Sequence, residues 1–189
     1  ADHSVNLTNK RILLGVTGGI AAYKIPTVVS SLVQAGANVR VLMTEAAARF
    51  VTPLTFQSLS GQPVISSIWD TSDYHESMHI GLARWCDLLV IAPASADAIA
   101  KLAAGICDDV VSLTACALPR STPVLLAPAM NEQMWENPVT QRNLATVKEM
   151  LGYHTVGPAA GWQACRTQGA GRMSEPEAIM EAAETVLGP

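Results

Sequence analysis

Two polar residues, Cys165 and Asn131, have sequence neighbours typical of catalytic or ligand-binding residues. Cys165 lies among glycines and is followed by Arg166 and Arg172, an electropositive setting that favours a thiolate. A reactive or proton-donating cysteine and an inert one are both open. Asn131 lies in the stretch Pro128 to Trp135, among two methionines, a proline and a tryptophan, a composition typical of a pocket wall. Its alternative role is the N-cap of a helix whose next residues belong to the core.

The glycine-rich turn from Gly15 to Ile20 has the composition of a phosphate cradle. Small residues let backbone N–H groups approach an anion, the Thr17 hydroxyl adds a donor, and the helix that begins there contributes its positive end. The glycine spacing departs from the G-x-G-x-x-G dinucleotide fingerprint, and the next strand ends in Met43 and Thr44 where a ribose-binding acid would stand. One phosphate, as in FMN, therefore suits the turn better than NAD. A tight turn without a ligand is the alternative role for Gly15, Thr17, Gly18, Gly19 and Ile20.

Three further stretches carry residues suited to binding or proton transfer. Ser95 follows the third expected strand, where it either caps a helix or sets its hydroxyl, with Asp97, against a polar ring edge. His79 begins a segment with a periodic apolar face, so it is either a structural histidine or a group for proton transfer near neutral pH. Asp108 and Asp109 fit the start of a helix better than a metal pair, because no histidine or third carboxylate lies at ligand spacing.

The apolar pattern alternates between strand-length runs and helix-length periods. The expected strands are 11–16, 39–43, 87–92, 124–127 and a short 154–156. The expected helices are 20–35, 45–50, 53–59, 79–85, 95–104, 108–118, 138–151 and a last one capped by Ser174 and ended by Gly188. This alternation predicts an α/β fold, a doubly wound, Rossmann-like parallel sheet in a single domain. The stretches around Ser95, Asn131 and Cys165 then gather with the cradle at the carboxyl edge of the sheet, where such folds bind ligands.

Composition bounds the class of protein. At 189 residues and 49% hydrophobic the chain fits one domain with a sizeable core, and 15% charged residues suggest an outer surface buried in a homo-oligomer. A net charge of −4 gives no support for a nucleic-acid partner. Four cysteines without metal or disulfide spacing indicate a reducing cytoplasm, and no apolar run is long enough for a membrane span. We expect residues 1–9 to be a disordered arm or a cloning remnant, and 157–173 to be a glycine-rich flap without regular structure.

Together these stretches resemble one family, the flavin-dependent cysteine decarboxylases, over residues 10–188. Pro128 to Trp135 matches the family motif P-x-M-N-x-x-M-W, and Pro93 to Asp97 is similar to the motif P-A-S-A-N-T. Supporting marks are the stretch 15–24, His79 with the apolar positions that follow it, and the flap around Cys165. Asp97 and Ala98 depart from the Asn and Thr of the P-A-S-A-N-T motif. An ionised aspartate only accepts hydrogen bonds, so a flavin carbonyl there would need a backbone N–H.

The resemblance implies an FMN cofactor and an oligomer. The phosphate would lie at residues 15–20 and the ring near Thr44, Phe50 and Ser95, with Ala94 and Asp97 as further contacts. The family forms a homotrimer, or a dodecamer built of trimers, with FMN at the subunit interface. It also implies that the natural chain can continue into a phosphopantothenate-cysteine ligase domain.

Within the family, the resemblance is to the branch that converts 4′-phosphopantothenoylcysteine to 4′-phosphopantetheine in coenzyme A biosynthesis. In the implied reaction the substrate's cysteine is oxidised to a thioaldehyde with hydride passing to FMN, CO2 leaves, and the hydride returns. His79 would be the base, Asn131 would hold the substrate carboxylate, and Cys165 would protonate the enethiol intermediate. The implied substrate pocket also includes Met130, Met134, Ala164 and Arg172.

Three other functions stay open. A peptidyl-cysteine decarboxylase would run the same oxidation on a peptide's C-terminal cysteine, but it would stop at the enethiol and would not need Cys165. A non-catalytic flavin-binding regulatory subunit would lack one of the three catalytic residues or carry a long acidic tail. A nicotinamide dehydrogenase is disfavoured by the glycine spacing of the first turn.

Overall fold

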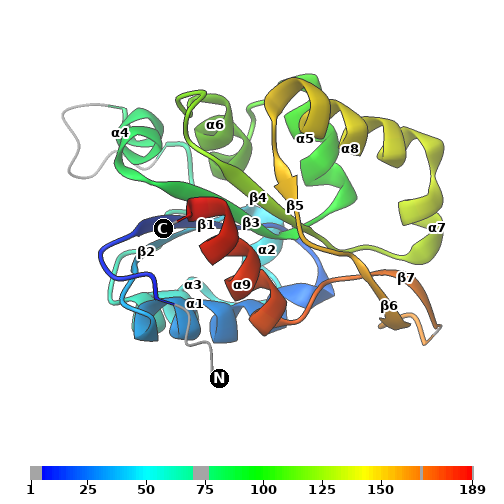
Figure 1. Cartoon of the computed structure of the whole chain (residues 1–189), viewed down its shortest axis with the longest axis horizontal. Coiled ribbons are helices and arrows are strands. Elements are labelled where there is room, and N and C mark those ends of the chain that lie inside the picture. Colours follow the sequence, from blue (N-terminus) through cyan, green and yellow to red (C-terminus); the bar gives the residue numbers. More distant parts are fainter. Residues whose placement is uncertain (1–5, 70–76, 167, 189) are drawn as a thin grey trace.

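The computed structural model describes residues 6–69, 77–166 and 168–188 and contains a five-stranded parallel sheet. The strand order is β2-β1-β3-β4-β5 (Figure 1). The strands are β1 (Arg11–Val16), β2 (Asn38–Met43), β3 (Leu88–Ala94), β4 (Val124–Pro128) and β5 (His154–Thr155). Because β2 and β3 lie on opposite sides of β1, the strand order reverses between β1 and β3, and a crevice opens at the carboxyl ends of these strands. The predicted doubly wound α/β sheet is confirmed.

Helices cover both faces of the sheet (Figure 1). Those on one face are α1 (Ile25–Gln34), α3 (Pro53–Ser60) and α9 (Pro176–Leu187), and those on the other are α4 (Met78–Trp85), α5 (Ala96–Ala104), α6 (Val110–Cys116) and α8 (Pro138–Leu151). Side chains of β1 alternate between the layers, with Leu14 in the first core and Leu13 in the second, both fully buried. Each such leucine stabilises the fold by about 2 kcal/mol. No helix in the described ranges is long and apolar enough to cross a membrane.

The first crossover differs from the single helix expected over 20–35. It is divided into a 3₁₀ helix, η1 (Ile20–Lys24), and α1. Pro26 lies in the first turn of α1, where its missing N–H costs nothing, but a proline cannot continue a helix that precedes it. The last helix also begins differently, because its N-cap is Glu175, whereas Ser174 is buried and does not cap it.

The segment expected to be an irregular flap is a β-hairpin. In it β6 (Ala159–Trp162) pairs antiparallel with β7 (Gln168–Arg172). A Cβ at Gly171 would lie 2.3 Å from the carbonyl oxygen of Met130, and a Cβ at Gly169 would lie 2.5 Å from the carboxyl carbon of Glu132. The prediction of irregular structure is wrong because these glycines allow the hairpin to pack closely on the loop after β4.

The N-terminal segment expected to be an arm is folded in its second half. Leu7 is only 1% exposed, and its N–H donates to the carbonyl of Ala35 at 2.9 Å. The Asn6 N–H donates to the Glu184 carboxylate at 3.1 Å. One leucine and these bonds are enough to hold residues 6–9 on the domain. Residues 1–5 lie outside the described part of the chain. The sequence also predicts a loop over 61–77, and positions 70–76 of it lie outside the described residues.

Candidate functional site

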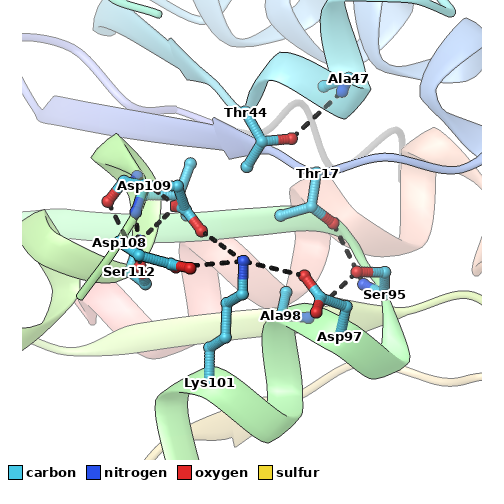
Figure 2. Close-up of polar contacts among 11 residues, drawn as sticks. Thr17, Thr44, Ala47, Ser95, Asp97, Ala98, Lys101, Asp108, Asp109 and Ser112 are labelled. Carbon is cyan, nitrogen blue, oxygen red and sulfur yellow. Dashed lines mark hydrogen bonds and ion pairs between the residues drawn. The ribbon is translucent and has the colours of Figure 1, made fainter. Parts of the chain in front are cut away.

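Thr17 joins the ends of β1 and β3 at the point where the strand order reverses (Figure 2). It is 2% exposed, and its hydroxyl donates to the carbonyl of Pro93 and accepts from the Ser95 N–H at 3.1 Å. The Ser95 Oγ in turn accepts from the Ala98 N–H at 3.1 Å and caps α5. In this conformation the Thr17 hydroxyl proton is used by the fold, so Thr17 positions the cradle instead of donating to a phosphate.

Gly18 and Gly19 lie in the short turn that connects β1 to η1. A Cβ at Gly18 would lie 2.5 Å from the Cβ of Ala46, so α2 (Glu45–Ala48) packs directly on this residue. A Cβ at Gly19 would meet nothing within 4 Å, and the φ of 177° at Gly19 is extended backbone that any residue adopts. The protein's own packing does not require glycine at position 19, which leaves the space beside it for a ligand.

A cavity of about 790 Å³ opens beside Gly18, between α2 and the first turns of α5 and α6. Its volume lies in the range of cofactor pockets. The hydroxyls of Thr44 and Ser95 line it, and each oxygen accepts a backbone N–H of the helix that follows, from Ala47 and Ala98, at 3.1 Å (Figure 2). Since a hydroxyl that accepts still carries its proton, both side chains offer a donor to a ligand.

A cluster of charges lies at another side of this cavity (Figure 2). The Lys101 Nζ lies 3.2 Å from the Asp97 carboxylate, 3.1 Å from Asp108 and 3.4 Å from Asp109. Burial opposes the charge of Lys101, but the hydrogen bonds to Asp108 and Asp97 outweigh it, and the pKa of Lys101 is raised. Three carboxylates around one ammonium leave this side negative, so a ligand phosphate is favoured near Gly19 instead.

Asp109 also begins α6 as an N-cap. Its Oδ1 accepts the N–H groups of Val111 and Ser112, each at 2.9 Å. The interpretation as a helix start is therefore confirmed for Asp109, whereas Asp108 lies one residue before the cap.

A second cavity, of about 570 Å³, adjoins the first, and Asn131 faces it. Residues that line both are Gly18, Ser95, Ala96 and Met134. Asn131 is the N-cap of α7 (Glu132–Glu136), and its Oδ1 accepts the N–H of Gln133 at 2.9 Å and of Met134 at 3.4 Å. Because a backbone N–H can only donate, the side-chain oxygen must face the helix and the NH2 group must face away from it. Capping, the alternative role of Asn131, is what aims its donor at the cavity.

Cys165 lies against Asn131 although 34 positions separate them. The Asn131 Nδ2 donates to the Cys165 Sγ at 3.6 Å, and the thiol donates to the Gln163 Oε1 at 3.5 Å. The structure thus brings together two of the three residues predicted to be catalytic, on one wall of the second cavity.

Two cations, Lys24 and Arg172, line the same cavity. Lys24 Nζ contacts the two carboxylate oxygens of Glu175 at 2.9 and 3.0 Å, and the Arg172 Nη2 donates to the same carboxylate. The hydrogen bond from Lys24 is the main reason that the pKa of Glu175 is lowered. Two cations share one carboxylate here, so this wall suits an anionic group.

Four of the predicted residues lie elsewhere. His79 lies on α4, which packs on α6, and it is not among the described residues that line either cavity. Gly15 and Ala94 are inside strands, and a Cβ at Gly15 would lie 2.8 Å from Val111, so Gly15 makes room for α6. Phe50 is 51% exposed beyond α2. The others line at least one cavity: Thr17, Gly18, Gly19, Ile20, Thr44, Ser95, Asp97, Met130, Asn131, Met134, Ala164, Cys165 and Arg172.

Three residues that line the cavities were not predicted from the sequence: Gln163, Lys101 and Lys24. Gln163 carries no signal in the sequence, because its partners Glu132 and Ala170 are known only from the fold. Lys101 follows Asp97 at the i,i+4 spacing of helical ion pairs. Lys24 carries no local signal, because its partner Glu175 is 151 positions away.

Comparison with known proteins agrees with this geometry. A model of the flavoprotein family matches residues 1–188. The coenzyme A biosynthesis bifunctional protein CoaBC of Vibrio cholerae is 50% identical over 184 residues, which are 97% of this chain and 45% of that protein. A solved PPC decarboxylase mutant complexed with pantothenoylaminoethenethiol has a TM-score of 0.84 at 32% identity, over 94% of this chain and 98% of that one. The FMN binding protein AtHal3 has a TM-score of 0.81 at 32% identity, over 94% and 96%.

Proposed function

The chain belongs to the flavoprotein family, and from that premise we propose that it binds FMN and converts 4′-phosphopantothenoylcysteine to 4′-phosphopantetheine with loss of CO2. The names of a coenzyme A biosynthesis protein and a PPC decarboxylase among its relatives support this activity. The observation that carries the proposal is the contact of Asn131 with Cys165 in a cavity that Gly18 and Gly19 also line. A carboxylate-binding donor and a proton donor for the substrate would then lie in the same cavity as a phosphate cradle for the cofactor.

The residues around the two adjoining cavities fit FMN. Gly19 lines the second cavity and leaves open space for a phosphate, while the hydroxyls of Thr44 and Ser95 offer donors in the first. The two cavities together give room for the ring between this cradle and the wall that carries Met130 and Met134. FMN, when bound, would supply a two-electron acceptor for the substrate's cysteine and return the hydride after CO2 has left.

Gly19→Asp is expected to weaken FMN binding about 100-fold, because two like charges 5 Å apart near a surface repel by about 3 kcal/mol. Gly19→Asn has the same size without the charge and is the matched control, so it should bind FMN more tightly than the aspartate variant. The measurement is a titration of FMN-free protein that follows the quenching of flavin fluorescence. Equal affinities of the two variants would place the phosphate elsewhere.

The side chains of the second cavity would hold the substrate and move one proton. An amide bears two N–H donors, so Asn131 can contact Cys165 with one and the substrate carboxylate with the other. A neutral donor holds a carboxylate less strongly than an arginine would, which leaves CO2 free to depart. Cys165 would then give its proton to the carbon that lost CO2. Lys24 and Arg172 would attract the substrate's phosphate.

We further propose that a second copy of the chain completes the site, in a homotrimer or a dodecamer of trimers. His79, the expected base, lines neither cavity of its own copy, so a neighbouring copy would have to supply it. Ile20, Tyr23 and Trp162 support a covered face, because they line the second cavity and are 54%, 62% and 66% exposed.

The extent of the natural protein follows from the same proposal. Residues 10–189 would form the decarboxylase domain, with the flap at about 157–173. The chain spans less than half the length of its bifunctional relative, so a ligase domain for phosphopantothenate and cysteine would occupy the rest. Four free cysteines fit a cytoplasmic protein.

Anaerobic mixing with 4′-phosphopantothenoylcysteine tests the proposed function. The flavin bands should bleach, CO2 should be released, and 4′-phosphopantetheine should form. A peptide that ends in cysteine serves as the competing substrate and should leave the flavin oxidised. The proposal fails if the purified protein takes up no FMN, or if the small substrate leaves the flavin spectrum unchanged.

A further inference from the structure

Gln163 is a buried amide in a hairpin whose neighbouring side chains are exposed. It is 7% exposed, whereas Trp162 is 66% exposed and Ala164 is also exposed. Its Oε1 accepts from the Glu132 N–H at 3.3 Å, and its Nε2 donates to the Ala170 carbonyl at 2.5 Å. Because an N–H only donates and a carbonyl only accepts, the amide of Gln163 has one orientation.

This orientation decides where the proton of Cys165 lies. The Cys165 Sγ is 3.5 Å from the Gln163 Oε1, which only accepts, and 3.6 Å from the Asn131 Nδ2, which only donates. The thiol therefore donates its S–H to Gln163 and accepts from Asn131. A hydrogen bond that only the protonated form can make favours that form. A thiolate would instead face the lone pairs of the Gln163 oxygen.

We propose that Gln163 is a positioning residue for Cys165, which keeps this thiol protonated and holds it against Asn131 until the proton is needed. The inference rests on the proposed decarboxylase function. In the step it serves, the S–H bond breaks, its electron pair stays on sulfur, and a C–H bond forms at the substrate carbon that lost CO2. The reduced cofactor, when bound, would supply the hydride of the same reduction, and water would return a proton to the sulfur afterwards.

The hairpin keeps other attachments when Gln163 is changed. The Glu132 carboxylate accepts the Ala170 N–H at 3.2 Å, and the Met130 N–H donates to the Gly171 carbonyl at 2.9 Å. These bonds hold β7 at the start of α7 without Gln163. The effect of a Gln163 variant should therefore concentrate on Cys165.

Alkylation of Cys165 by iodoacetamide tests the proposal without FMN or substrate. In Gln163→Leu the thiol loses its hydrogen bond to the Gln163 oxygen, and Cys165 should be modified about fivefold faster at neutral pH, the factor typical of one lost hydrogen bond. Gln168→Leu makes the same change at an exposed position of the same hairpin and should match the unchanged protein. Peptide mass spectrometry assigns the modified cysteine. Equal rates for the two leucine variants would overturn the proposal.

Turnover provides the readout that a merely structural role would not give. Gln163→Leu should bleach the flavin at the normal rate but form product more slowly, and adding Cys165→Ser should slow product formation no further than Cys165→Ser alone. Gln163→Glu should form product faster as the pH falls to about 4, where a protonated carboxyl again both donates and accepts. Slower bleaching in Gln163→Leu, or an additive double variant, would contradict the proposal. If the protein without substitutions forms no product, the proposed function is contradicted. The alkylation rates would still decide the role of Gln163.

Discussion

Cys165→Ser is expected to reduce the flavin and release CO2 at close to the normal rate, yet to form 4′-phosphopantetheine at least about 100-fold more slowly, the loss typical of a missing general acid. A hydroxyl is a far weaker acid than a thiol, so the proton for the final reduction is not delivered. Serine is nearly the size of cysteine and can still contact Asn131 and Gln163, so the first half of the reaction should survive. Anaerobic stopped-flow absorbance, with mass spectrometry of the accumulated enethiol, measures both halves.

Cys116→Ser is the matched control for this prediction. Cys116 is exposed at the end of α6, and it does not line either of the two joined cavities. Its replacement should leave both half-reactions unchanged. Normal product formation by Cys165→Ser would remove the proton-donor role, and a loss of flavin bleaching would assign Cys165 to the oxidation instead.

The sheet and much of the site could be predicted because local patterns determine them. The apolar runs of β1, β3 and β4 are buried on both faces, so each stands out in the sequence as a continuous hydrophobic stretch. Parallel strands bring their carboxyl ends to one edge, which is enough to place Ser95 and Asn131 beside the Gly18 turn. At Asn131 the two alternatives proved compatible, because the cap orients the amide that faces the cavity.

What could not be predicted depends on contacts between distant segments. The glycines at 169 and 171 suggested disorder, and only the nearby Met130 and Glu132 show that they serve close packing. Gln163 looks like an ordinary polar residue until its partners at 132 and 170 are known. The hydroxyl of Thr17 suggested a phosphate donor, but its bond to Pro93, 76 positions away, uses its proton.

His79→Asn and Cys165→Ser proteins should each form almost no product alone, yet an oligomer assembled from both should recover activity. His79 lies on α4 and is not among the described residues around either cavity, so we expect it to reach Cys165 across an interface between copies. In a cyclic oligomer each site would take His79 from one copy and Cys165 from the next. When equal amounts of the two variant chains assemble at random, about one site in four contains both an intact His79 and an intact Cys165. Co-expression with two affinity tags isolates the mixed oligomer for product analysis.

Two controls separate a shared site from other causes of recovery. The two variant proteins, each assembled separately and then mixed, should stay inactive. Activity in this mixture would mean that an intermediate diffuses between oligomers, and not that one site is shared by two copies. His154→Asn, at an exposed position of β5, should keep full activity by itself. If the mixed oligomer stays inactive, His79 does not act across an interface, and if His79→Asn alone still bleaches the flavin, it is not the base. Because neither variant chain carries both groups, recovery confined to the mixed oligomer requires an active site that is built from two copies.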